Sequence, residues 1–304
     1  MLAGVGDGAW PTDTKSEAAQ TWFNEGLNLY HAFDHIEARA AFAKAAALDP
    51  SCARCEWGVA LGLGPTLNYG VTAAETAQAL VHAERAAALV QPGDDRAKGL
   101  IDALILRYGK DPKRDQLFAR AMDELSRRYP DDDQIAVLAA HALMIPGRGD
   151  EPQAVARAEA ILKGVLARRP DDTAAIHYYI HATEFAGHPT KALPYAERLA
   201  SRAPGASHLV HMGAHALIHA GDYERVALVN AKALAVDAEV QAKLGQPGPL
   251  SAEMYYLHNY IFGLEGALMS GDAALALKYA EHAEVAFPAS FDTGTISAPA
   301  SPNV

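Results

Sequence analysis

Residues 170–187, PDDTAAIHYYIHATEFAG, match residues 204–221, PGASHLVHMGAHALIHAG, when the sequence is shifted by 34 positions. Apolar residues recur in both stretches with the period of an α-helix, and each stretch starts at a proline and ends at a glycine. A fixed period of this length indicates a stack of helix pairs, because one such unit cannot bury its apolar face alone. The shift superposes Pro170 on Pro204, His177 on His211, His181 on His215 and Gly187 on Gly221.

The same unit, two helices joined by a short turn and closed by a proline, recurs along the chain. Periodicity predicts one helix over residues 16–34 and a second over residues 36–48, which Asp49-Pro50 ends. The alternation typical of β-strands is hard to find. We therefore expect an all-α chain of about six to seven helix pairs between Ser16 and Pro288. Later units close at Pro130, Pro170, Pro204 and Pro288.

The first unit carries a recognisable residue pattern: Trp22, Gly26, Ala38, Phe42, Ala45 and Pro50. In this spacing it resembles the tetratricopeptide repeat, whose 34-residue unit forms two helices. The resemblance implies an α-solenoid, a right-handed superhelix in which the first helix of each pair lines the concave side. It divides the chain into an N-terminal extension (1–15), a solenoid (16–289) and a flexible tail (290–304).

Four stretches are similar to a histidine-rich group of bacterial tetratricopeptide proteins. They are LDPSCARCEWG (48–58), LGPTLN (63–68), HYYIHATE (177–184) and HLVHMGAH (208–215), and the similarity runs from Trp22 to about Gly271. It implies no particular catalytic activity. The superfamily as a whole implies protein–protein scaffolding, although a fold does not determine a function.

Composition excludes some classes of partner. The 304 residues are 50% hydrophobic and 21% charged, with a net charge of −11, which argues against nucleic acid or an anionic membrane. No apolar run is long enough to span a bilayer. Residues 1–10 lack the basic and apolar regions of a signal peptide, so we expect a cytoplasmic chain, or a periplasmic one if this is a mature exported form.

Cys52 and Cys55 form an isolated C-x-x-C motif. A four-cysteine zinc ribbon needs a second pair, and a thioredoxin motif needs a βαβ unit around it. Two interpretations stay open. The cysteines are small apolar side chains at a helix start, or they pair in an oxidising compartment.

Histidine is concentrated in one part of the chain: seven of the 13 histidines lie between residues 177 and 219. His177 and His181 are one helical turn apart, with Glu184 following on the same face. His208, His211, His215 and His219 project within an arc of roughly 80° of the next unit's first helix. Because the two units superpose, we expect both histidine faces to point the same way.

Neighbouring units extend this face. With an insertion allowed for in each case, His141 aligns with His181, His258 with His208, and Glu265 with His215. Helix axes about 8–10 Å apart let imidazoles on adjacent helices reach one metal ion. The predicted metal ligands are His177, His181, His211, His215, His141 and His208. The residues predicted to line a substrate groove are Glu184, His219, His258, Glu265 and Tyr178.

Imidazole ligands with one or two carboxylates suit copper, iron, zinc or nickel, and the sequence does not choose among them. Two other interpretations of the cluster stay open: a wet groove that binds a polar ligand, and packing alone. Isolated histidines are usually structural, and we expect this of His82, His188 and His282.

The favoured hypothesis is a metal-dependent protein, oxidative or hydrolytic, acting on a small molecule or peptide in the concave groove. The alternatives are a non-catalytic scaffold that binds a peptide or protein, and a metal storage or delivery protein. The chaperone-tail clamp of some tetratricopeptide proteins is disfavoured because the predicted groove faces carry no Lys or Arg.

Overall fold

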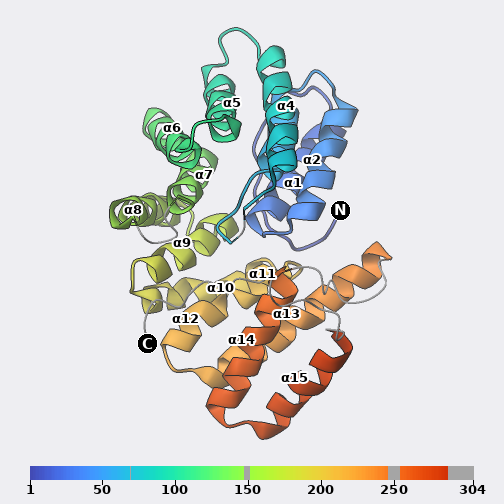
Figure 1. The fold of residues 1–304 in the computed structure, drawn as a ribbon, viewed down its shortest axis with the longest axis vertical. Coiled ribbons are helices and arrows are strands. Elements are labelled where there is room, and N and C mark those ends of the chain that lie inside the picture. Colours follow the sequence, from blue (N-terminus) through green and yellow to red (C-terminus); the bar gives the residue numbers. More distant parts are fainter. Residues whose placement is uncertain (69, 147–150, 246–253, 287–304) are drawn as a thin grey trace.

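The computed structural model describes residues 1–68, 70–146, 151–245 and 254–286. These residues are all-α, with no strand among them (Figure 1). The helices are α1 (Glu17–His31), α2 (His35–Leu48), α3 (Ala53–Gly62), α4 (Ala73–Leu89), α5 (Asp95–Tyr108), α6 (Arg114–Arg128), α7 (Asp133–Met144), α8 (Pro152–Arg168), α9 (Thr173–Phe185), the 3-10 helix η1 (Pro189–Ala192), α10 (Leu193–Arg202), α11 (Ser207–His211), α12 (Gly213–His219), α13 (Tyr223–Leu244), α14 (Met254–Ser270) and α15 (Ala273–Ala286).

Successive helices contact one another in chain order from α1 to α9, and again from α12 to α15. Figure 1 shows α9, α10 and α11 crossing the molecule between the N-terminal helices and the C-terminal ones. Helix α1 also contacts α9, although seven helices separate them in the chain. This long-range contact brings the end of α1 to the middle of the molecule. Among the described helices, none has the length and hydrophobicity needed to cross a membrane.

Aspartates start several of these helices. Asp94, Asp132, Asp172 and Asp222 are the N-caps of α5, α7, α9 and α13, and each carboxylate accepts a hydrogen bond from the backbone N–H three residues later. Such a cap satisfies a helix donor that would otherwise lack a partner and stabilises the helix by about 1 kcal/mol. The aspartates therefore set where these four helices begin.

The N-terminal extension packs against two parts of the fold that are far apart in the chain. The Asp13 carboxylate accepts hydrogen bonds from the N–H groups of Ala53 and Arg54, at 2.7 and 3.1 Å. Trp10 is buried against Trp57, and the Gly205 N–H donates to the Gly4 carbonyl at 2.8 Å. Residues 1–15 thus connect α3 to the turn before α11. The predicted tail, 290–304, lies outside the described residues.

Two glycines let the first three helices approach closely. Phe42 on α2 fills the space in front of both Gly26 and Gly58, so that an added Cβ would lie 2.7 Å and 2.5 Å from its ring. Both glycines are therefore required by packing rather than by backbone conformation.

We expect Gly58→Val to lower the free energy of unfolding by about 2–3 kcal/mol, because the branched side chain overpacks against the Phe42 ring. Gly164→Ala is the matched control. Only the end of a flexible arginine lies near an added Cβ there, and alanine favours the helix by about 0.5–1 kcal/mol. Urea unfolding of both variants measures the difference. Equal stability of the two would contradict this account of the packing.

Candidate metal centre

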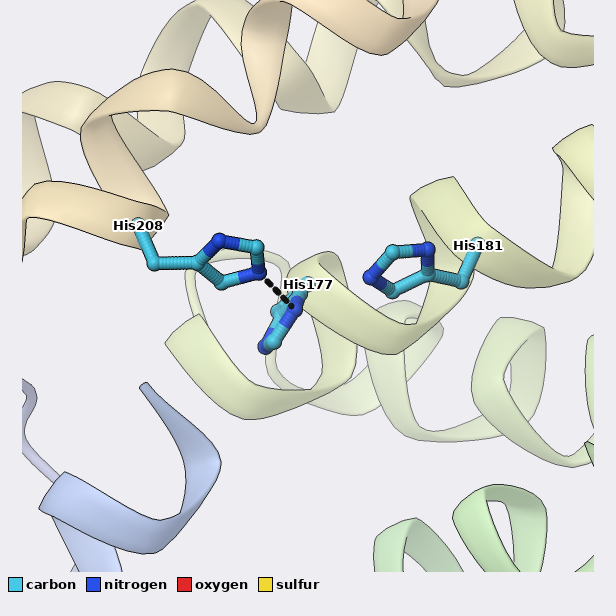
Figure 2. A group of neighbouring side chains, drawn as sticks. All are labelled: His177, His181 and His208. Carbon is cyan, nitrogen blue, oxygen red and sulfur yellow. Dashed lines mark hydrogen bonds between the residues drawn. The ribbon is translucent and has the colours of Figure 1, made fainter. Parts of the chain in front are cut away.

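Four helices converge to place six histidines side by side. Helix α9 presents His177 and His181 one turn apart, and α11 presents His208 towards them (Figure 2). His211 is the last residue of α11, His215 lies on α12, and His258 lies on α14. The structure thus gathers residues from three predicted units.

The first group, which we name triad A, consists of His177, His181 and His208. One ring nitrogen from each lies within 4.8 Å of the others, so the group could hold a metal ion. The Nε2 atoms of His177 and His208 are 3.2 Å apart (Figure 2). Two ligands of one tetrahedral ion, each about 2.0–2.1 Å from it, would be about 3.3 Å apart. The observed separation fits a ligand pair, and without a metal it is also the length of a hydrogen bond from His208 Nε2–H to His177 Nε2.

The second group, triad B, consists of His211, His215 and His258. Its ligand atoms also lie within 4.8 Å of one another, and the Nε2 atoms of His215 and His258 are 3.3 Å apart. The sequence places His258 among groove residues rather than ligands. The structure puts its ring beside His215, so it belongs with the possible ligands.

Outer partners orient three of these rings. The Nδ1–H of His177 donates to the His31 carbonyl at 2.6 Å. The Nδ1–H of His215 donates to the Glu184 carboxylate at 3.0 Å. Neither oxygen can donate, so each ring carries its proton on Nδ1 and turns an unprotonated Nε2 inward.

Asn230 orients His211 in the same way. Its side-chain N–H donates to the Val226 carbonyl at 2.8 Å, which leaves its Oδ1 to accept from His211 Nδ1–H at 2.6 Å. Metal-binding histidines almost always have such a partner on the second ring nitrogen, because it fixes both tautomer and orientation. The sequence analysis did not identify Asn230 or the His31 carbonyl.

Two inward nitrogens have no protein partner. His181 Nε2 and His211 Nε2 are buried and have no hydrogen-bond partner within the described part of the chain. A buried polar atom left in this state costs about 1–3 kcal/mol. A bound cation would remove that cost, so the donor set fits a metal.

Burial also sets the charge of the cluster. Burial, followed by the neighbouring imidazoles, holds the pKa of His177, His208 and His211 well below the usual histidine range. The same causes lower the pKa of His258 to about 3. These rings are therefore neutral at physiological pH, the form in which imidazole binds a metal.

Glu184 is the carboxylate of the cluster. Burial alone would raise its pKa, but the attraction of His215 and hydrogen bonds from His181 and His215 hold the pKa well below its usual range. The ionised side chain contacts a ring of each triad, at 3.8 Å from His181 Nδ1 and 3.0 Å from His215 Nδ1. Glu184 is therefore placed to orient one ring of each triad.

We expect Glu184→Gln to weaken metal binding by about 10- to 100-fold, because an outer carboxylate raises the basicity of its imidazole. Competition with a chromophoric chelator measures the affinity. Glu159→Gln is the control, because Glu159 contacts His188 away from the triads. Identical affinities for the two variants would show that the carboxylate has no such role.

Phe33 forms one wall of triad A. Its ring centroid is 4.4 Å from that of His177, 4.9 Å from His208 and 5.9 Å from His181. The backbone of Phe33 has φ 65°, which is a genuine outlier for a bulky residue. The repeat allows Phe33 to be compared with the residues at the equivalent position of later helix pairs.

Four helix ends share one turn. The N–H groups of Asp34, His188, Asp222 and Asp272 each donate to the carbonyl five residues earlier. The residue before each of these has positive φ; in three turns it is Gly187, Gly221 or Gly271, and in the first it is Phe33. Phenylalanine thus occupies a left-handed position where later units use glycine, at a cost of about 1–2 kcal/mol. Such strain persists where the surroundings fix it, as the histidine rings do here.

We expect Phe33→Ala to lower the free energy of unfolding by about 3 kcal/mol and to speed release of bound metal to a chelator, because a cavity opens beside triad A. Phe33→Gly should be about 1 kcal/mol more stable than Phe33→Ala, since glycine relieves the positive φ. Denaturant unfolding compares the two. If the alanine variant were the more stable, the strain at this position would not be real.

The other predicted residues lie at or beyond the edge of the cluster. His141 is outside both triads; its Nδ1 lies 3.2 Å from the Tyr30 hydroxyl and its ring stacks on Tyr178. Tyr178 is fully buried, with its hydroxyl 3.3 Å from His31 Nδ1. The His219 side chain is 50% exposed and Glu265 is exposed. His219 Nε2 still reaches Glu184, at 3.9 Å.

The cluster is buried, which corrects the expectation of an open groove. Five of the six histidines are buried, and even the most exposed of these, His215, has only 5% of its surface accessible. The sixth, His258, is partly buried. The physical reason is the contact of α1 with α9, which lays Phe33 over the rings. Glu184, His219 and part of His258 reach solvent.

The isolated histidines and the cysteines are placed as follows. His82 pairs with Glu56 at 2.7 Å and His188 with Glu159 at 2.9 Å, both away from the triads. The side chain of His282 lies outside the described residues. Cys52 and Cys55 form a disulfide at the start of α3, so neither thiolate can serve as a ligand.

A scan against protein-family models gives no match for this chain, and a comparison with curated proteins gives none either. The fold and site define the class directly: an all-α protein with a buried cluster of six histidines that could hold a metal ion.

Proposed function

We propose that this chain is a transition-metal-binding protein whose metal is held by the histidines of triads A and B. One observation carries the proposal. His177, His211 and His215, on three helices, turn Nε2 towards the cluster while outer partners accept from their Nδ1–H groups. Packing alone gives no reason for this arrangement, since it leaves buried ring nitrogens without partners among the described residues.

We also propose that the fold is a tetratricopeptide-like α-solenoid. Three features support this: the 34-residue period, the turn repeated after α1, α9, α12 and α14, and the contacts between successive helices. In this fold the first helices of neighbouring units lie side by side, which explains why equivalent histidines meet.

The proposed activity is oxidative or hydrolytic chemistry on a small molecule. A bound transition metal supplies Lewis acidity or electrons. The protein holds neutral imidazoles ready to bind it, and Phe33 excludes water from one side. A small molecule is favoured over a peptide because five of the six clustered histidines are buried, so little of the cluster meets solvent.

Elemental analysis of protein purified without a histidine tag, from manganese through zinc, tests the metal. We expect at least one equivalent of copper, iron, nickel or zinc per chain, released by a chelator with a fall in thermal stability. No metal as isolated, and none retained after reconstitution and desalting, would overturn the proposal.

Metal storage or delivery is the second candidate, favoured by the burial of the ligands. The two functions predict different rates of metal release. A delivery protein should release its metal to an acceptor protein or chelator within minutes, whereas a catalytic centre should retain it through many turnovers.

A further inference from the structure

The two triads are not separate sites. Within triad A the ring centroids are 5.0 Å apart for His177–His181 and for His177–His208, and 6.3 Å for His181–His208. Between the triads they are 5.4 Å for His181–His215, 5.6 Å for His208–His211 and 6.4 Å for His208–His258. Inside triad B they are 4.6–5.4 Å, so the distances across the boundary overlap with those inside the triads and the six rings form one continuous cluster.

Outer contacts connect the two halves as well. The Glu184 carboxylate reaches His181 of triad A with one oxygen and His215 of triad B with the other. Each triad also has its own anchor, the His31 carbonyl for His177 and Asn230 for His211. Two independently oriented ligand sets thus share one carboxylate between them.

The small number of negative charges beside the triads favours metal ions of low positive charge. Imidazole is a neutral ligand when it binds a metal, and Glu184 is the carboxylate in contact with both triads among the described residues. Two divalent ions would place four positive charges beside one negative charge in a buried site, whereas two monovalent ions would place two. Because buried charge is costly, a metal with a stable monovalent state is favoured. Copper has one, and in its divalent state it also binds such ligands most tightly.

We propose that the cluster is a dinuclear copper centre, with one ion on triad A and one on triad B. This proposal rests on the proposed function and deepens it. The sequence suggests a single ion; the structure supplies three ring nitrogens for each of two. Two ions held side by side can exchange two electrons with one substrate, one electron from each Cu(I) as it becomes Cu(II).

The test begins with anaerobic titration of the untagged apoprotein with Cu(I), followed by desalting. We expect two equivalents retained per chain. After oxidation to Cu(II), the integrated electron paramagnetic resonance signal should account for far less than the total copper, because adjacent Cu(II) ions couple magnetically.

Variants assign each ion to its triad. His177→Ala with His208→Ala should keep one equivalent on triad B, with a full signal, and His211→Ala with His258→Ala should keep one on triad A. The control pair, His82→Ala with His188→Ala, should keep two coupled ions. Circular dichroism confirms that each variant is folded, and the wild-type titration remains decisive if one is not.

The outcomes separate the two proposals. One equivalent in the wild type would overturn the dinuclear centre and leave the proposed function standing. Two equivalents with a full, uncoupled signal would also overturn it, as would retention of zinc but not copper. No retained metal of any kind would overturn both.

Discussion

Replacing His181 and His215 together by alanine should abolish metal binding while the helical content stays the same. The double variant removes one ligand from each triad, so neither triad keeps three donors. Loss of an outer partner alone weakens metal binding by about 10- to 100-fold, and loss of a ligand from each triad should exceed this. Metal content after reconstitution and the thermal shift on adding metal are the measurements.

The fold should survive this change. His181 Nε2 has no hydrogen-bond partner among the described residues, so removing that ring removes an unsatisfied buried atom as well as packing contacts. His188→Ala is the matched control, because its partner Glu159 lies away from the triads. A folded double variant with unchanged metal content would place the metal elsewhere and favour an interaction module.

The apoprotein should lose stability as the pH falls below about 6.5. Burial lowers the pKa of His31 to about 4, and burial together with the charges of Arg39 and His31 lowers that of His35 to about 3. In the unfolded chain both titrate near the usual value of about 6.5. The unfolded state therefore binds more protons in this range, and the stability present above pH 6.5 is lost as the pH falls.

The expected loss is about 3 kcal/mol for each residue by pH 4, since one pKa unit corresponds to about 1.4 kcal/mol. Denaturant unfolding of the metal-free protein between pH 7.5 and 4 measures it. His35→Phe should flatten the curve, because the site is aromatic on several sides and phenylalanine takes up no proton. Stability that stays constant between pH 6.5 and 5, above the range where carboxylates titrate, would contradict the prediction.

Local features could be predicted because they depend on short stretches of chain. The first two helices begin and end within a few residues of their predicted bounds, at 17–31 and 35–48. His177 and His181 share a face because a helix has 3.6 residues per turn. The alignment of His258 with His208 indicated that α14 would supply another histidine, which would complete the metal ligands or contact substrate.

Other features could not be predicted from one sequence. Phe33 aligns with Gly187 and Gly221, but only its φ of 65° and its contacts reveal that the ring covers triad A. His141 aligns with His181 as well as His215 does, yet it packs against Tyr30 and Tyr178 instead. The difference depends on how each helix is oriented against its neighbours. The spacing of residues within one helix gives no information about that orientation.

The sequence by itself determined that the chain is helical, where its repeated turns fall and which histidines lie on a common face, because period, caps and spacing act over one or two helical turns. Only the tertiary structure decided that the histidines are buried and divided into two triads. The contact of α1 with α9 brings the His31 carbonyl to His177, across 146 residues. The reason is geometric: the orientations of successive helices from α1 to α9 add up, and their sum determines whether α1 and α9 meet.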